Sequence, residues 1–204
     1  MLDKLSAIAV DKGVQPVIVC TKGDLAEAEF LRSAYERSTL PFIRIDYGSG
    51  AGLDEVKQWI SGRLCAFCRQ LRCGQVHAAQ RIAAGCCPGR PAPSARTLGR
   101  GRHTTREVTI FEAFGGRIAD TPGFASLEAN RAGFIPKENL EHAFPEFGPY
   151  LGQCQFTGCS HRTEKGCAVR QALAEGKLSQ TRYDSYCAMY DEVKDVKDWQ
   201  RPKF

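Results

Sequence analysis

Long apolar runs are absent from this sequence. No stretch approaches the roughly 20 residues needed to cross a bilayer, and residues Met1–Ala7 lack the charged start and apolar core of a secretory signal. We therefore expect a cytoplasmic protein that does not bind a membrane. Its 204 residues, 43% hydrophobic and 25% charged, fit a globular protein of one or two domains.

Acidic residues are missing from a long central window. Between Val56 and Arg106 there is no Asp or Glu, whereas the window holds one lysine and nine arginines, so its net charge is +10. The rest of the chain has 18 basic and 23 acidic residues, a net charge of −5. A mildly acidic protein therefore carries a strongly basic insert.

The ten cysteines are unevenly distributed along the chain. Without a secretory signal, clustered cysteines indicate metal ligands in a reducing compartment rather than disulfides. The first cluster, in the basic window, is Cys65, Cys68, Cys73, Cys86 and Cys87; the second is Cys154, Cys159 and Cys167; Cys20 and Cys187 stand alone.

The alternation of expected strands and helices indicates an α/β layered domain. Short β-branched or alternating apolar runs predict strands, and apolar residues that share one helical face predict helices. The expected strands cover residues 16–20, 41–45, 107–113 and 116–119; the expected helices start near Asp24 and Gly50 or cover 134–145, 168–175 and 181–197.

The segment Thr21-Lys22-Gly23-Asp24 follows directly on the first expected strand. A carboxylate in this place can accept two hydrogen bonds from the edge of a guanine, and a lysine stem can lie over the base plane. Thr21 stands where asparagine is usual in such a motif. The same residues are equally well interpreted as an ordinary helix cap at Asp24.

Two further segments suit a phosphate-bound Mg²⁺. In the sequence GRHTT, residues 101–105, the hydroxyl of Thr104 or Thr105 could bind the ion. In the sequence DTPG, Asp120 could reach the ion through water, and the amide of Gly123 could approach a γ-phosphate. Each segment alone could be a polar turn, but the two together at this spacing favour a phosphate site.

A compact group of soft metal ligands lies near the C-terminus. Three thiolates and one imidazole suit a closed tetrahedral Zn²⁺ site, which leaves no position open for water and is therefore structural. Gly158 and Gly166 would allow the tight turns that the loop needs. The four expected ligands, within fourteen residues in the pattern C-x₄-C-x-H-x₅-C, are Cys154, Cys159, His161 and Cys167.

The order K-x-D, GRHTT, DTPGF and C-x₄-C-x-H-x₅-C resembles the circularly permuted GTPases of the RsgA type, over residues from about 8 to 197. The resemblance implies a circularly permuted P-loop GTPase-like α/β domain over residues 1–145, followed by a small, mostly helical zinc-binding domain over 146–204. It implies a monomer that hydrolyses GTP to GDP with Mg²⁺ and acts on the small ribosomal subunit and its rRNA in late 30S maturation. It also implies an N-terminal oligonucleotide-binding β-barrel; we expect this chain to lack it and to be truncated.

The residue after Gly123 is not one that can orient the attacking water. Phe124 follows Gly123, where many GTPases place a glutamine that orients the water, and a phenyl ring cannot do so. His103 is the nearest titratable candidate, because an imidazole can accept a proton near neutral pH. An exposed histidine without a catalytic role is an equally good interpretation.

A P-loop, G-x-x-x-x-G-K-[ST], is missing from the place where such a GTPase needs one. It should lie between Phe67 and Gly99, but residues 68–85 read CRQLRCGQVHAAQRIAAG. Permitted codons for this segment, read after the first base is dropped, translate as AGSSGVGKSTLLNALLP, a full P-loop followed by a helix. Apart from the first base of the arginine and leucine codons, only third codon bases are free in this translation, so a chance match over such a long run is improbable.

We hypothesise that one extra base entered near Phe67 or Cys68 and that a compensating change before about Leu98 restored the frame. Residues 68–97 would then be aberrant and the GTPase impaired. The alternative is a genuine basic RNA-binding arm in a zinc-bearing rRNA-binding module without nucleotide turnover. The DNA that encodes residues 60–106 decides between the two.

Overall fold

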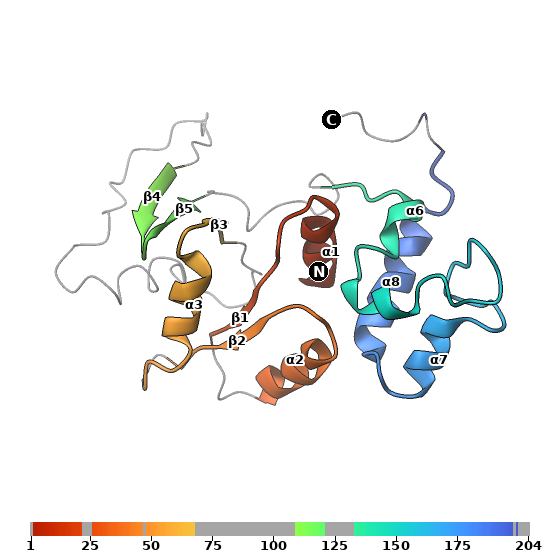
Figure 1. Ribbon diagram of the computed structural model, residues 1–204, viewed down its shortest axis with the longest axis horizontal. Helices are drawn as coiled ribbons and strands as arrows, with labels where there is room; N and C mark the ends of the chain where they lie inside the picture. Colours follow the sequence, from red (N-terminus) through yellow and green to blue (C-terminus); the bar gives the residue numbers. More distant parts are fainter. Residues whose placement is uncertain are drawn as a thin grey trace, which may run out of the picture. The chain divides into compact units, whose positions relative to one another are not determined.

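The computed structural model describes residues 2–21, 26–46, 48–67, 109–120, 133–197 and 199 (Figure 1). Two compact units are present: residues 1–43 with 128–204, here called the terminal unit, and residues 44–127, the central unit. Among the described residues, no helix combines the length and the apolar character needed to span a bilayer. The helices are α1 (Leu2–Asp11), α2 (Ala26–Glu36), α3 (Leu53–Ile60), α6 (Lys137–Leu140), the 3₁₀ helix η2 (Pro145–Tyr150), α7 (Ala168–Ala174) and α8 (Gln180–Val193); the strands are β1 (Ile18–Cys20), β2 (Phe42–Arg44), β3 (Leu64–Ala66), β4 (Thr109–Ala113) and β5 (Gly116–Asp120).

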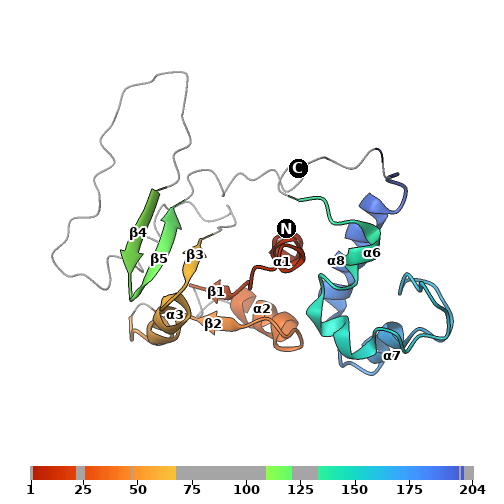
Figure 2. The ribbon, with the colours of Figure 1, turned by 45° about the horizontal axis from the view of Figure 1, so that its top comes forward.

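A three-stranded sheet in the order β3-β5-β4 lies in the central unit (Figure 2). β3 is parallel to β5, with Ala66 opposite Ala119, and β4 is antiparallel to β5. The turn that joins β4 to β5 has positive φ at both central residues, 54° at Phe114 and 73° at Gly115. Two-residue turns of this kind match the twist of an antiparallel hairpin.

Helix α3 packs closely on this sheet because two glycines make room for it. It contacts β5 and buries Val56 and Ile60. Gly116 opens β5, and a Cβ atom there would lie 1.9 Å from the carbonyl oxygen of Ile60. Gly52, with φ of +80°, precedes the helix, and a Cβ atom there would lie 2.1 Å from the carbonyl oxygen of Arg44. Neither approach is compatible with a side chain.

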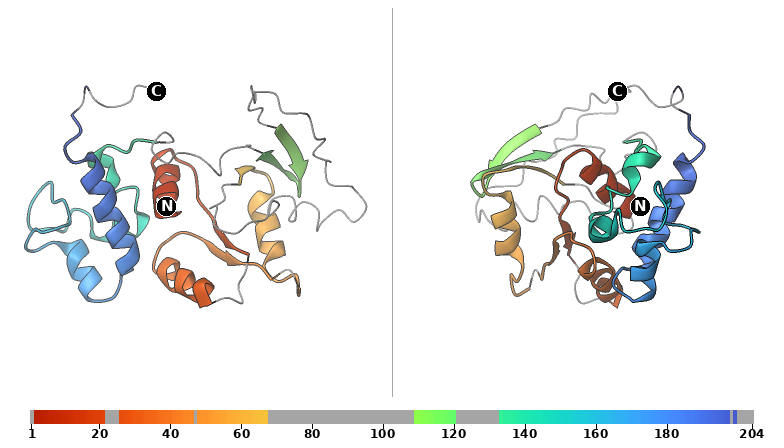
Figure 3. Two further views of the ribbon diagram at one scale, coloured as in Figure 1. Left: turned by 180° about the vertical axis from the view of Figure 1, so that it is seen from behind. Right: turned by 45° about the vertical axis from the view of Figure 1, so that its right-hand side comes forward.

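Among its described residues, the terminal unit contains two hydrophobic cores. The smaller core is formed by Ile18, Ala34, Tyr35 and Leu40, from β1, α2 and the segment that leads to β2. The larger core brings together α1, α6, η2, α7 and α8, and its helices α1, α6 and α8 contact one another (Figure 3). Three aromatic rings form its centre, with ring centroids 5.5 Å apart for Phe144 and Phe147 and 5.0 Å apart for Phe147 and Tyr186.

A buried arginine connects the helices of the terminal unit. Arg182 of α8 donates from Nε and Nη2 to the two carboxylate oxygens of Glu146 and from Nη1 to Asp3 Oδ1, at 2.8 Å. The side chains of Arg182 and Glu146 are only 2% and 3% exposed. The guanidinium also lies 5.1 Å from the ring centroids of Tyr35 and Phe144. A charge removed from water is thus compensated by two carboxylates and two aromatic faces.

Most of the expected elements are present. β1, β2, β4 and β5 fall on the four expected strands, and α2, α3, α7 and α8 fall on expected helices. The helix expected over 134–145 is wrong in extent, because α6 covers only 137–140 and η2 begins at Pro145. Phe144 has φ −112° and ψ 88°, so the backbone leaves the helical region where that ring enters the core. Helix α1 and strand β3 were not expected from the sequence.

The expected domain boundary at 145/146 has no counterpart in the packing of the larger core. That core combines Ala7 and Phe144 with residues from 147 to 189. The boundary stays a prediction, and the aberrant segment 68–97 lies outside the described residues.

Candidate metal centre and nucleotide-binding residues

The loop that carries the expected metal ligands is shaped by two glycines. Gly158 and Gly166 have φ of +72° and +67°, so the prediction that they permit tight turns is confirmed. At Gly166 a Cβ atom would lie 2.5 Å from Gln155 Oε1, and the amide of Gln155 donates to the carbonyl of Gly166 at 3.0 Å. The two ends of the loop are therefore held side by side.

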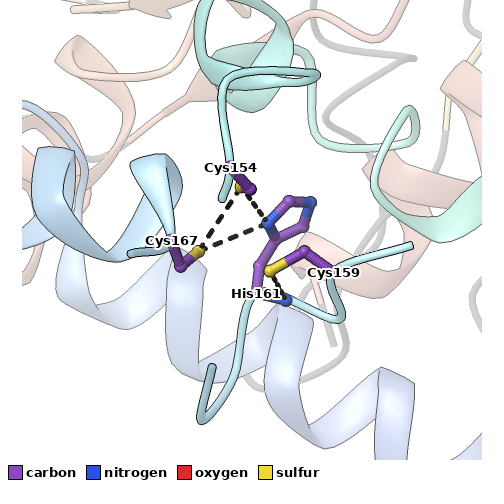
Figure 4. A group of neighbouring side chains, drawn as sticks. All are labelled: Cys154, Cys159, His161 and Cys167. Carbon is purple, nitrogen blue, oxygen red and sulfur yellow. Dashed lines mark hydrogen bonds between the residues drawn. The ribbon is translucent and has the colours of Figure 1, made fainter. Parts of the chain in front are cut away.

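The structure brings the four expected ligands together (Figure 4). The Sγ atoms of Cys154 and Cys167 are 3.9 Å apart, and His161 Nδ1 lies 3.5 Å from the first and 3.4 Å from the second. All four ligand atoms, with Cys159 Sγ, lie within 4.8 Å of one another.

These distances fit the donor set to a tetrahedral metal ion. With Zn–S near 2.3 Å and Zn–N near 2.0–2.1 Å, a tetrahedron needs S···S separations of about 3.8 Å and S···N separations of about 3.5 Å. The separations among Cys154 Sγ, Cys167 Sγ and His161 Nδ1, 3.9, 3.5 and 3.4 Å, agree with these values. Three sulfurs and one imidazole nitrogen at such distances are compatible with a zinc site.

Backbone amides point at the sulfur atoms. Cys159 Sγ accepts from the amide of His161 at 3.4 Å, and Cys154 Sγ accepts from the amide of Ala168 at 3.4 Å. Cys167 caps α7, where its sulfur accepts from the amide of Arg170. Amide donors favour the thiolate over the thiol.

Burial acts in the opposite direction on the metal-free cluster. It raises the pKa of the Cys159 thiol to about 12, and it also raises the pKa of Cys167. Without a metal these thiols are therefore protonated at neutral pH. Metal binding has to displace their protons, so the affinity of the site should rise with pH.

Groups outside the ligand set hold the loop in place. Glu164 accepts hydrogen bonds from the hydroxyl and amide of Ser160 and from the amides of residues 162 and 163. Burial opposes its charge, but these hydrogen bonds outweigh burial and lower the pKa of Glu164 to about 2. From α8, Tyr183 donates to the carbonyl of His161 at 2.8 Å and Tyr186 donates to that of Ser160 at 2.9 Å.

The expected nucleotide-binding residues are only partly described. Thr21 follows β1 directly and is half-buried. Asp120 is the last residue of β5, where its backbone lies opposite Thr109. The others, Lys22, Asp24, His103, Thr104, Thr105 and Gly123, lie outside the described residues.

The sheet nevertheless places two of the expected segments at one edge. β3 and β5 are adjacent and parallel, and their pairing ends with Ala66 opposite Ala119, one residue before β5 ends. The segment that should hold a P-loop starts just after β3, and the DTPG sequence starts at Asp120. Ligands of parallel α/β sheets bind at the carboxyl ends of the strands, so both segments begin where a phosphate would be expected.

Known proteins are similar to this chain in sequence and in fold. A family model described as RsgA GTPase matches residues 1–130. A small ribosomal subunit biogenesis GTPase RsgA from Geobacillus kaustophilus is 34% identical over 97% of this chain and 68% of its own length. The protein of the same name from Ruminiclostridium cellulolyticum is 33% identical over 100% of this chain and 66% of its own length. The chain thus spans about two thirds of the length of these relatives.

Two solved structures have a similar fold. The crystal structure of YjeQ from Thermotoga maritima has a TM-score of 0.68 at 26% identity. The matched region covers 96% of this chain and 66% of the YjeQ chain. The crystal structure of YloQ, described as a circularly permuted GTPase, has a TM-score of 0.69 at 27% identity. The matched region covers 100% of this chain and 64% of the YloQ chain. The fold is therefore that of a circularly permuted GTPase, as the motif order predicts. With the family match over residues 1–130, this chain belongs to the RsgA GTPase family.

Proposed function

We propose that the protein is a GTP-binding and GTP-hydrolysing factor for small ribosomal subunit biogenesis, acting late in 30S maturation, and that this chain is impaired in nucleotide turnover. The observation that carries the proposal is the family membership together with the order of the guanine, Mg²⁺ and zinc motifs. The relatives named above are called GTPases of small ribosomal subunit biogenesis. We further propose a cytoplasmic monomer with its GTPase domain in residues 1–145 and its zinc-binding domain in 146–204.

Each nucleotide-binding residue has a role that its chemistry supports. Lys22 and Asp24 read the guanine base, because the carboxylate accepts from the base edge. Thr104 or Thr105 and Asp120 serve the Mg²⁺ that accompanies GTP. In addition, the amide of Gly123 senses the γ-phosphate, His103 positions the attacking water, and Thr21 flanks the base.

The missing P-loop is the reason for proposing impairment. The amides and lysine of that loop neutralise the β- and γ-phosphates, and the printed residues 68–85 contain neither lysine nor the motif. Loss of one partner from a buried charged pair typically costs about 3–5 kcal/mol. The chain should therefore bind GTP weakly and hydrolyse it negligibly.

Nucleotide binding can be compared between the printed chain and a chain in which residues 68–97 are restored to the shifted frame. We expect tight GTP binding and turnover only in the restored chain, and a weaker preference for guanine when Asp24→Ala is added to it. Equal GTP hydrolysis by the two chains would contradict both the frameshift hypothesis and the role assigned to the P-loop.

The C-terminal cluster is proposed to hold one structural Zn²⁺ through Cys154, Cys159, His161 and Cys167. The ion would close the loop between residues 154 and 167 and supply no open position for chemistry. Metal analysis of the purified chain should give one zinc per chain. Because this site does not depend on the P-loop segment in sequence, its occupancy should be the same in the printed and the restored chains.

The second candidate is a zinc-bearing rRNA-binding module without nucleotide turnover. It is favoured by the net charge of +10 between Val56 and Arg106 and by the missing phosphate-binding lysine. Small-subunit rRNA binding should then be strong and steeply salt-dependent without any nucleotide. Replacing the arginines of residues 68–97 with glutamine would abolish it in that case, and would leave it largely unchanged if the segment is aberrant.

A further inference from the structure

Glu141 lies next to the cluster although it is not one of the four ligands. One of its carboxylate oxygens, Oε2, is 2.8 Å from Nε2 of His161. Its other oxygen is 3.6 Å from Nε2 of His142, an exposed residue. The side chain of His161 is 3% exposed and that of Glu141 is 30% exposed. A buried imidazole therefore has a carboxylate on one nitrogen and two sulfurs near the other.

The two ring nitrogens of His161 thus have different surroundings. Nδ1 lies 3.5 Å from Cys154 Sγ and 3.4 Å from Cys167 Sγ, whereas Nε2 faces Glu141. A neutral imidazole carries one proton, and only the unprotonated nitrogen can bind a metal. An ionised carboxylate can only accept hydrogen bonds, so the arrangement requires the proton on Nε2 and leaves the lone pair of Nδ1 directed at the sulfurs.

We propose that Glu141 is a positioning residue that fixes His161 in the Nε2–H tautomer, so that Nδ1 is the atom that binds the metal. The inference rests on the zinc site of the proposed function and goes beyond its ligand set. A hydrogen-bonded carboxylate also makes the imidazole a more basic ligand and restricts rotation of the ring.

The backbone holds Glu141 where this role requires it. The residue follows α6 directly, between Leu140 and the core residues Ala143 and Phe144, which are at most 1% exposed. Helix α6 in turn contacts α1 and α8. The carboxylate is therefore anchored in the larger core, and through it the metal loop is tied to a helix 20 residues earlier in the chain.

The experiment uses the whole chain loaded with Zn²⁺, with the variants Glu141→Ala and Glu141→Gln. Glu175→Gln is the matched control, because Glu175 is an exposed carboxylate of the same unit that contacts Gln171 and Lys177. Zinc affinity is measured by competition with a chromophoric chelator, and the state of each His161 nitrogen by ¹⁵N NMR of histidine-labelled protein.

In the parent we expect His161 Nε2 to carry the proton and Nδ1 to have the shift of a metal-bound nitrogen. Glu141→Ala should weaken zinc binding by about 10–100-fold, as loss of such a partner typically does. Glu141→Gln, whose amide oxygen can still accept, should fall between the parent and the alanine variant, and Glu175→Gln should match the parent.

Metal bound at Nε2 in the parent would overturn the proposal, whatever the variants do and even if Glu141→Ala does not fold. Parent-like zinc affinity and an unchanged tautomer in both Glu141 variants would overturn it as well. A parent chain that takes up no zinc would overturn the metal assignment of the proposed function and this role with it, so the two failures are distinguishable.

Discussion

The buried pair of Arg182 and Glu146 should contribute strongly to the stability of the terminal unit. In Glu146→Ala the guanidinium loses the partner of both Nε and Nη2 and keeps the carboxylate of Asp3 as a partner. Because its side chain is only 2% exposed, water cannot replace the lost acceptor. Breaking a buried pair in this way costs about 3–5 kcal/mol, and we expect the free energy of unfolding to fall by that amount.

The measurement is equilibrium urea unfolding of the zinc-saturated chain, followed by far-UV circular dichroism. The double variant Glu146→Leu with Arg182→Met should lose less stability than Glu146→Ala, because it removes both charges together and keeps apolar volume. Glu36→Ala is the control, since its partner Arg32 is exposed and the pair should contribute little. A loss below about 1 kcal/mol in Glu146→Ala at unchanged m value would refute the reasoning.

Three further outcomes are expected. Cys159→Ser should remove most of the zinc and loosen the helix that follows the loop, and full occupancy by metal analysis would show that the ligand set is wrong. Gly116→Ala should destabilise the protein by about 1–3 kcal/mol in the same urea assay, because the new Cβ would meet the carbonyl oxygen of Ile60. Gly148→Ala is its control and should be close to neutral, because a Cβ there would meet no neighbouring group within 4 Å. The pKa of Glu164 is lowered to about 2, against an ordinary 4.5. Its contribution to the free energy of unfolding is therefore complete above pH 4.5 and is lost as the pH falls towards 2. Glu164→Gln should remove this part of the acid dependence of stability, measured in a pH-jump unfolding series.

The four metal ligands could be predicted because they lie within fourteen residues, so their spacing alone limits the geometry. The groups that support them could not. Glu141 and Tyr183 are 20 and 22 residues from His161 and reach it only through the packing of α6 and α8. No local pattern marks a carboxylate or a tyrosine for such a contact.

The fold shows the same division between local and non-local information. Strands β1, β2, β4 and β5 have apolar runs or alternation that a sequence reveals. β3 covers only Leu64–Ala66 and is too short to show any periodicity. It pairs in parallel with β5, which lies far along the chain, and no local pattern reveals such a pairing. Helix α6 ends at Leu140, and by Phe144, whose ring is buried in the core, the backbone has left the helical region that the pattern of its neighbours predicts.

The contact between Asp3 and Arg182 joins residues that are 179 positions apart in the chain. At a synthesis rate of roughly 5–20 residues per second, the first helix would wait about 10–35 s on the translating ribosome before its partner exists. During that time Ala7 and Ile8 have no core to enter, since their cluster is completed by residues beyond 134. Such distant closure is slow to form, so in a nascent chain Ala7 and Ile8 of α1 would stay exposed to chaperones until the segment beyond residue 134 has been made.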